Sequence, residues 1–143
     1  MTDKPSINLD YLAAQYAQTI IQKTKDKKAS DVENTMTKAL GVLQEDGVYA
    51  CFLYLLAREK ENGAVVVDEM LNLLSDLPFG WKKPSKNNQP DATIVLRFIS
   101  EQVTKDLDRL LLAREVLEQM LIYARYGAKA RDKGGSETPG ASS

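Results

Sequence analysis

Apolar residues recur at helical spacing along most of this chain, and that periodicity constrains the fold more than any other feature. In the first such segment, Leu9, Leu12, Ala13 and Tyr16 begin a pattern that continues to Ile21. Spacing of i, i+3, i+4 and i+7 places apolar side chains on one face of a helix. Comparable stripes begin at Val32, Val48, Val66, Ile94 and Val103. The sequence therefore predicts an all-α domain, a bundle of five to six helices with a long C-terminal helix.

Short signals mark where these helices should begin and end. The lysine-rich residues 23–28 interrupt the first stripe, and Ser30 with Glu33 forms a capping-box sequence for the second helix. Gly47 suits the left-handed position at a helix C-terminus. Asp91 is the expected cap of the fifth helix. The pattern leaves open whether the fifth and last helices are continuous.

The length of 143 residues fits one domain, because domains cluster at about 100–150 residues. We expect residues 1–7 to be flexible, residues 8–131 to form the bundle, and the Gly- and Pro-rich residues 132–143 to be a disordered tail. The longest apolar stretch, residues 48–57, is shorter than the roughly 20 residues that span a bilayer. The N-terminus has no apolar segment typical of a signal peptide. These features predict a cytoplasmic protein without membrane contact.

The chain contains no histidine and one cysteine. The absence of histidine excludes Ser-His-Asp and Cys-His catalysis and His-based zinc sites, and a lone cysteine cannot form an intramolecular disulfide. Cys51 lies in the most apolar segment, so we interpret it as a small buried hydrophobe and not as a reactive thiol. The isolated glycines are interpreted as helix terminators, because no phosphate-binding loop surrounds them; they are Gly41, Gly47 and Gly63.

One enzymatic route remains, which is carboxylate chemistry with a hard cation such as Mg²⁺. Glu115 and Glu118 would share one helix face, and Asp68 and Glu69 lie on another helix. All-α nucleotide pyrophosphohydrolases use two facing pairs of glutamates, whereas one pair is evident here. We therefore expect no catalytic residue, no metal ion and no cofactor.

Positive charge is concentrated in three short stretches of a chain whose formal net charge is −1. Residues 23–28 hold four lysines and one aspartate, residues 82–86 hold three lysines, and residues 125–133 hold four cations and one aspartate. At a Debye length of about 8 Å in physiological salt, a partner senses each patch and not the total. We interpret the stretches as contacts for a nucleic-acid backbone. The alternative is that each is a solvated helix end.

Aromatic residues lie beside two of these stretches. Trp81 precedes Lys82 and Lys83, and Tyr123 and Tyr126 alternate with basic residues near the end of the last helix. Rings stack on bases, and cations neutralise phosphates, in proteins that bind single strands without sequence preference. Two alternatives stay open: Trp81 as a loop anchor packed on the bundle, and the tyrosines as helix-packing or subunit contacts. The sequence favours contact with the backbone and not base reading.

Three segments together resemble a known family. They are LDYLAAQYAQTII, KALGVLQEDGVYACFLYLLAREK and DRLLLAREVLEQMLIYARYGAKAR, within residues 8–131. The chain resembles the small all-helical subunit of type III-B (Cmr-type) CRISPR effector complexes, and the small subunit of Csm-type complexes is a close competitor. Lys38 and the turn at residues 46–48 match the family's lysine-bearing helix and the turn after it. Gly41 stands where proline is common in the family.

The resemblance implies a non-enzymatic subunit, several copies of which stack along an RNA-guided complex in antiviral defence. Its implied partners are the other subunits, copies of itself and the backbone of guide and target RNA, with no small-molecule substrate. The candidate RNA-binding residues are Lys23, Lys25, Lys27, Lys28, Lys38, Lys82, Lys83, Lys86, Arg125, Lys129 and Arg131. The candidate protein-interaction residues are Trp81, Tyr123 and Tyr126. The alternative is a helical protein–protein adaptor that does not contact nucleic acid.

Overall fold

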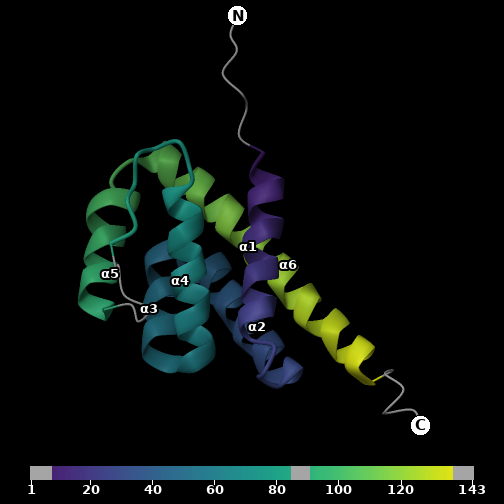
Figure 1. The fold of residues 1–143 in the computed structure, drawn as a ribbon. Coiled ribbons are helices and arrows are strands. Elements are labelled where there is room, and N and C mark those ends of the chain that lie inside the picture. Colours follow the sequence, from purple (N-terminus) through teal and green to yellow (C-terminus); the bar gives the residue numbers. More distant parts are fainter. Residues whose placement is uncertain (1–7, 85–90, 137–143) are drawn as a thin grey trace, which may run out of the picture.

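The computed structural model describes residues 8–84 and 91–136, with side-chain burial given as far as Arg131. Every regular element within these ranges is helical (Figure 1). The elements are α1 (Leu9–Lys23), α2 (Ala29–Asp46), α3 (Val48–Arg58), α4 (Glu61–Ser75), α5 (Ala92–Phe98), the π-helical segment η1 (Ile99–Val103) and α6 (Leu107–Ser136). This confirms the predicted all-α bundle with a long C-terminal helix. In the described ranges no helix is both long and apolar enough to cross a membrane.

Helix α6 packs against both α1 and α2, and these are the most extensive helix contacts in the fold (Figure 1). Asp10, in the first turn of α1, contacts Tyr123, and the turn after α1 contacts Arg131, so α1 runs parallel to α6. Gln44, near the end of α2, contacts Arg114, so α2 runs antiparallel to α6. The turn between α1 and α2 therefore lies at the C-terminal end of α6.

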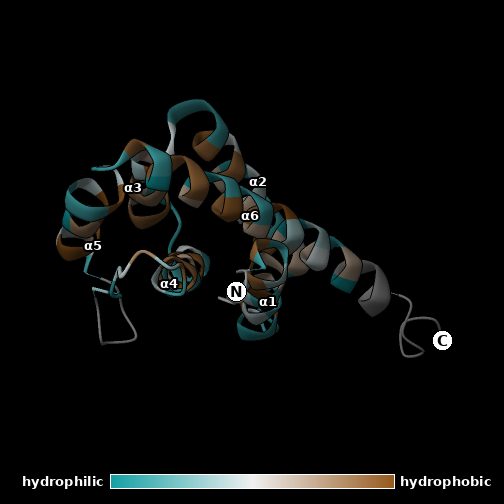
Figure 2. Ribbon diagram, turned by 90° about the horizontal axis from the view of Figure 1, so that it is seen from above, coloured by the Kyte–Doolittle hydropathy of each residue, from teal (hydrophilic) through white to brown (hydrophobic). Residues whose placement is uncertain are grey.

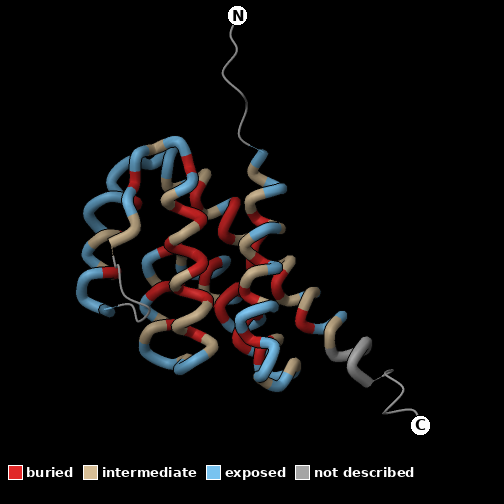
Figure 3. Tube along the Cα trace, viewed as in Figure 1, coloured by how far each residue is buried: buried red, intermediate tan, exposed pale blue. Residues whose placement is uncertain are grey.

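Helix α4 packs against α1 on one side and α3 on the other, and α5 packs against α3 (Figure 2). Buried positions lie on the faces that these helices turn toward one another (Figure 3). Phe52, Met70 and Leu117 are fully buried, and burying a side chain of this size contributes about 1.5–3 kcal/mol. The expectation for Cys51 is confirmed: its thiol is buried 3.5 Å from the carbonyl oxygen of Ala39, and burial raises its pKa to about 12.

Two of the predicted helix ends are confirmed and one is wrong. Gly47 has a φ of +99° between α2 and α3, and the Asp91 carboxylate accepts a hydrogen bond from the Ile94 amide at 3.2 Å. The capping box at Ser30 is not formed. Helix α2 already begins at Ala29, and its N-cap residue, Lys28, makes no side-chain capping bond. Ser30 is therefore a helical residue and not the cap.

Two glycines interpreted as terminators lie inside helices, Gly41 in α2 and Gly63 in α4. A Cβ atom at Gly63 would lie 2.7 Å from the carbonyl oxygen of Leu55 and 2.6 Å from Cβ of Glu59. Gly63 thus allows the start of α4 to approach the end of α3. A Cβ at Gly41 would meet nothing within 4 Å.

The fifth and last helices are separate. After α5 the chain passes through η1, where the Thr104 amide donates to the Ile99 carbonyl, five residues earlier. The chain then turns, and α6 begins after Asp106, whose carboxylate accepts a hydrogen bond from the Arg109 amide at 3.1 Å.

The C-terminal boundary of the bundle also differs from the prediction. Residues 132–136, expected in the disordered tail, continue α6. Extending an existing helix costs far less than starting one, so a helix held by α1 and α2 is readily extended at its C-terminal end. The expectations for residues 1–7 and 137–143 lie outside the described residues.

Candidate nucleic-acid interface

Two of the three basic stretches meet in space. The Arg131 guanidinium donates hydrogen bonds to the carbonyl oxygens of Thr24 and Lys27, at 2.8 and 2.6 Å. These carbonyls belong to the turn between α1 and α2, so this turn and the end of α6 form one surface. We name it the basic corner. It comprises Lys25, Lys27, Lys28, Arg125, Lys129 and Arg131.

The cations of the basic corner differ in whether they already form an ion pair or another contact within the chain. Lys25, Lys28 and Lys129 are exposed and form no ion pair with another described residue. Lys27 pairs with the exposed Glu61, and a surface pair of this kind contributes about 0–1 kcal/mol. The Arg125 guanidinium lies 5.9 Å from the centre of the Tyr126 ring. The corner therefore presents positive charge to solvent.

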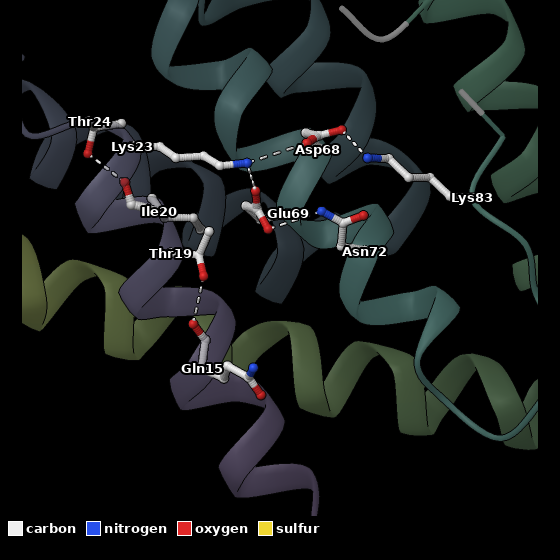
Figure 4. A network of polar contacts seen from close by, with 9 residues as sticks. All are labelled: Gln15, Thr19, Ile20, Lys23, Thr24, Asp68, Glu69, Asn72 and Lys83. Carbon is white, nitrogen blue, oxygen red and sulfur yellow. Dashed lines mark hydrogen bonds and ion pairs between the residues drawn. The ribbon is translucent and has the colours of Figure 1, made fainter. Parts of the chain in front are cut away.

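Lys23, from the first basic stretch, and Lys83, from the second, both contact carboxylates of α4 (Figure 4). The Lys23 ammonium lies 2.5 Å from a carboxylate oxygen of Glu69 and 3.9 Å from one of Asp68, and Lys83 lies 2.5 Å from the other oxygen of Asp68. The Asn72 side chain donates to Glu69 at 3.1 Å. We name these five residues the acid-paired network.

In the acid-paired network, the lysines form ion pairs with carboxylates of the same chain. Glu69 is 1% exposed, and a buried carboxylate needs a charged or hydrogen-bonding partner. The hydrogen bond from Lys23 to Glu69 raises the pKa of the Lys23 ammonium. Lys23 and Lys83 thus neutralise carboxylates of their own chain, and the charge segregation evident along the sequence is not maintained here in space.

The other candidate lysines lie elsewhere. Lys82 is exposed after α4, and Lys38 is exposed on α2. Lys86 lies outside the described residues.

The three candidate aromatic residues have different environments. Trp81 is 6% exposed and lies edge-on to Phe79, with ring centres 4.9 Å apart, as expected for a loop anchor. Its ring is not an open stacking surface. Tyr123 is half-buried, and its hydroxyl donates to the Asp10 carboxylate, a contact between α6 and α1 that raises its pKa. Tyr126 is 60% exposed on α6.

A polar hollow of about 470 Å³, which sequence reasoning missed, adjoins the basic corner. It lies between one face of α2 and the segment formed by the connection from α3 to α4 and the first turn of α4. Its walls are formed by Lys27, Asp31, Asn34, Thr35, Lys38, Glu59, Lys60, Glu61 and Asn62. One signal could have found part of it, because the four α2 residues recur at i, i+3, i+4 and i+7 and form a polar stripe.

Acidic residues do not gather into a cation site within the described ranges, where no group of three or more potential metal ligands occurs. Glu118 instead accepts a hydrogen bond from the Gln44 side chain at 2.8 Å, joining α6 to α2.

Comparisons with known proteins do not extend this description. No protein-family model, curated protein or solved structure matches the chain.

Proposed function

We propose that this chain is a non-catalytic subunit of a ribonucleoprotein and contacts the RNA backbone through the basic corner. The observation that carries the proposal is the joining of two basic stretches by Arg131, over 100 residues apart in sequence. Exposed lysines attract phosphates without reading bases, and their binding is sensitive to salt. Following the resemblance given above, the ribonucleoprotein is a type III CRISPR effector that acts in antiviral defence in the cytoplasm.

Its partners in this proposal are other effector subunits, further copies of the chain, and guide and target RNA. The basic corner takes the RNA contact. The acid-paired network does not, because its lysines already have carboxylate partners. Of the eleven candidate RNA-binding residues, the proposal therefore relies on those of the corner.

The test is salt-dependent binding of the full chain to single-stranded RNA. A triple variant, Lys25→Gln, Lys28→Gln and Lys129→Gln, should bind more weakly and reduce the slope of log K against log salt by about two units, since each contact with a single strand contributes about 0.7. The matched control removes three exposed cations elsewhere, at Arg58, Arg97 and Lys105. Equal loss in both triple variants would mean that general charge, and not the corner, attracts the RNA.

A second candidate function is a protein–protein adaptor without RNA contact. It is favoured by Tyr126, exposed on α6, and by a mostly apolar groove of about 360 Å³ between α1 and α6 that Ala17, Ile21 and Tyr123 help to line. If the chain purifies from its host with protein partners but no nucleic acid, this function replaces the first.

A further inference from the structure

The groove between α1 and α6 is an open, mostly apolar hole on the outside of the bundle. Its volume is about 360 Å³, and no charged residue lines it. A Cβ atom at Gly127 would lie 3.0 Å from Cγ1 of Ile21, so the two helices approach each other closely at the base of the groove. The lining is formed by Ala14, Ala17, Gln18, Ile21, Gln22, Tyr123 and Gly127.

A large aromatic side chain is exposed on the same face of α1. Tyr11 is 62% exposed, and it precedes Ala14 and Gln18 at spacings of three and four residues, which places the three on one helix face. Tyrosine is enriched at protein interfaces and at their hot spots. The face thus carries both a protruding ring and, about one to two turns further along α1, an apolar hole.

The two ends of this face have opposite charges. Asp10 is exposed at one end, where its carboxylate accepts a hydrogen bond from the hydroxyl of Tyr123 in the groove lining. Lys25 is exposed at the other end, where its amide donates to the carbonyl of Gln22 at 3.4 Å. A partner that fits the face therefore has an apolar middle and the reverse order of charges. A second copy of this chain, turned end for end, has that order.

We propose that two copies of the chain pair through this face about a two-fold axis, with their α1 helices antiparallel. Tyr11 of each copy enters the groove of the other. When Tyr11 lies opposite Gln22 of the second copy, Asn8 lies opposite Lys25, because the two helices run in opposite directions. Asp10 is then about 3 Å from the level of Lys25 along the helix axis, within reach of a lysine side chain. The tyrosine and the charge pair are thus satisfied by one arrangement, twice in each dimer.

The inference goes beyond the proposed function, because two free copies pair without RNA. It also differs in symmetry from stacking along an RNA strand. A two-fold contact uses the same surface on both copies and closes after two, whereas stacking needs a head-to-tail contact between two different surfaces. Lys28 and Lys129 of the basic corner take no part in the pairing.

The first experiment is sedimentation velocity of the full chain at concentrations from about 10 μM to 1 mM, a range that covers weak association. We expect conversion of monomer to dimer with no larger species. Tyr11→Ala, which removes the ring from both grooves, should weaken the dimer at least about tenfold. The control is Tyr49→Ala, at a residue 41% exposed on α3, which forms no part of the groove and should leave the dimer unchanged.

Exchanging charges tests the antiparallel order. Asp10→Lys places two cations together at each end of the dimer, and Lys25→Glu places two carboxylates there, so either variant alone should pair about tenfold more weakly. An equal mixture of the two variants should restore pairing, because each copy then supplies the charges that the other lacks. Recovery in the mixture also establishes that both variants are folded.

The possible results separate this inference from the proposed function. Monomers over the whole range, a dimer unaffected by Tyr11→Ala, or a mixture that pairs no better than its components would each overturn the pairing. Species that grow beyond the dimer with concentration would indicate a head-to-tail contact and contradict the two-fold axis. Tyr11→Ala keeps every lysine of the basic corner, so salt-dependent RNA binding by this variant tests the proposed function by itself. Pairing without corner-dependent RNA binding would mean that the proposed function has failed and the inference stands.

Discussion

The lysines of residues 23–28 are divided between the acid-paired network and the basic corner, and their environments differ: one is paired with a carboxylate, and others are exposed to solvent. Lys23 lies against the buried Glu69, whereas Lys25 and Lys28 are exposed without an ion pair to another described residue. The difference is decided by α4, whose carboxylates reach Lys23 from 46 residues away in sequence. A lysine-rich stretch is therefore not one functional unit. The fold pairs part of it with buried carboxylates and leaves the rest exposed.

The largest expected effect comes from moving α4, on which the acid-paired network depends. Gly63→Ala places a methyl group 2.7 Å from the Leu55 carbonyl oxygen, and overpacking of this kind costs about 1–3 kcal/mol. Urea unfolding measures the loss. The control is Gly41→Ala, inside α2 with open space around it, which should stabilise by about 0.5–1 kcal/mol. Similar values for the two variants would mean that α4 does not need its close approach to α3.

Breaking the network directly should have the next largest effect. Lys23→Met removes the partner of Glu69 and leaves a buried carboxylate with Asn72 alone. We expect a loss of about 2 kcal/mol, less than for a fully enclosed pair because the Lys23 side chain is 49% exposed. Lys25→Met, two residues away, should change stability by less than about 0.5 kcal/mol. If both variants unfold at the same urea concentration, the proposed distinction between the two regions is wrong.

Arg131, in the basic corner, also contributes to stability, and replacing it should lower the free energy of unfolding by a smaller amount. Arg131→Ala removes two hydrogen bonds to the carbonyls of Thr24 and Lys27, at a cost of about 1 kcal/mol. Amide exchange should accelerate in the turn between α1 and α2. Lys129→Ala, also at the end of α6, should leave both quantities unchanged. Unaltered exchange in Arg131→Ala would show that the turn does not depend on α6.

The smallest effect should appear at alkaline pH and distinguishes the partly buried Tyr54 from an exposed tyrosine. Burial, together with a hydrogen bond to Glu59, raises the pKa of Tyr54 to about 12. A tyrosine in the unfolded chain loses its proton near pH 10, so the native state binds more protons and stability falls as pH rises from about 10 to 12. Tyr54→Phe should reduce this slope, as measured by unfolding at each pH. Tyr11→Phe, at a residue that is 62% exposed, is the control, and an equal reduction there would contradict the assignment.

Helix identity could be predicted from the sequence because apolar periodicity reports directly on which face is buried. The positive φ of Gly47 and the cap at Asp91 also follow from local chemistry. The failures concern tertiary contacts. Gly63 is a glycine because another helix approaches it, and no neighbour in sequence reveals that. Ser30 has a capping sequence, but α2 begins one residue earlier.

The candidate site could be predicted less well, for the same reason. The meeting of the α1–α2 turn with Arg131 depends on the parallel packing of α1 and α6. The pairing of Lys83 with Asp68 depends on the path of the chain after α4. The hollow was missed because Lys60, in the short connection before α4, and Asn62, in the first turn of α4, belong to no distinctive motif. The sequence shows which residues are charged, but it does not show which of the charged side chains face solvent.

The most direct test of the account is cross-linking of RNA within the native assembly. The full chain is purified from its host with its partners, irradiated and digested, and peptides that carry a nucleotide are identified by mass spectrometry. The account predicts co-purifying RNA and adducts on peptides that contain residues 25–28 and residue 129. Assemblies without RNA, or adducts confined to peptides around Lys82 and Lys83, would contradict it.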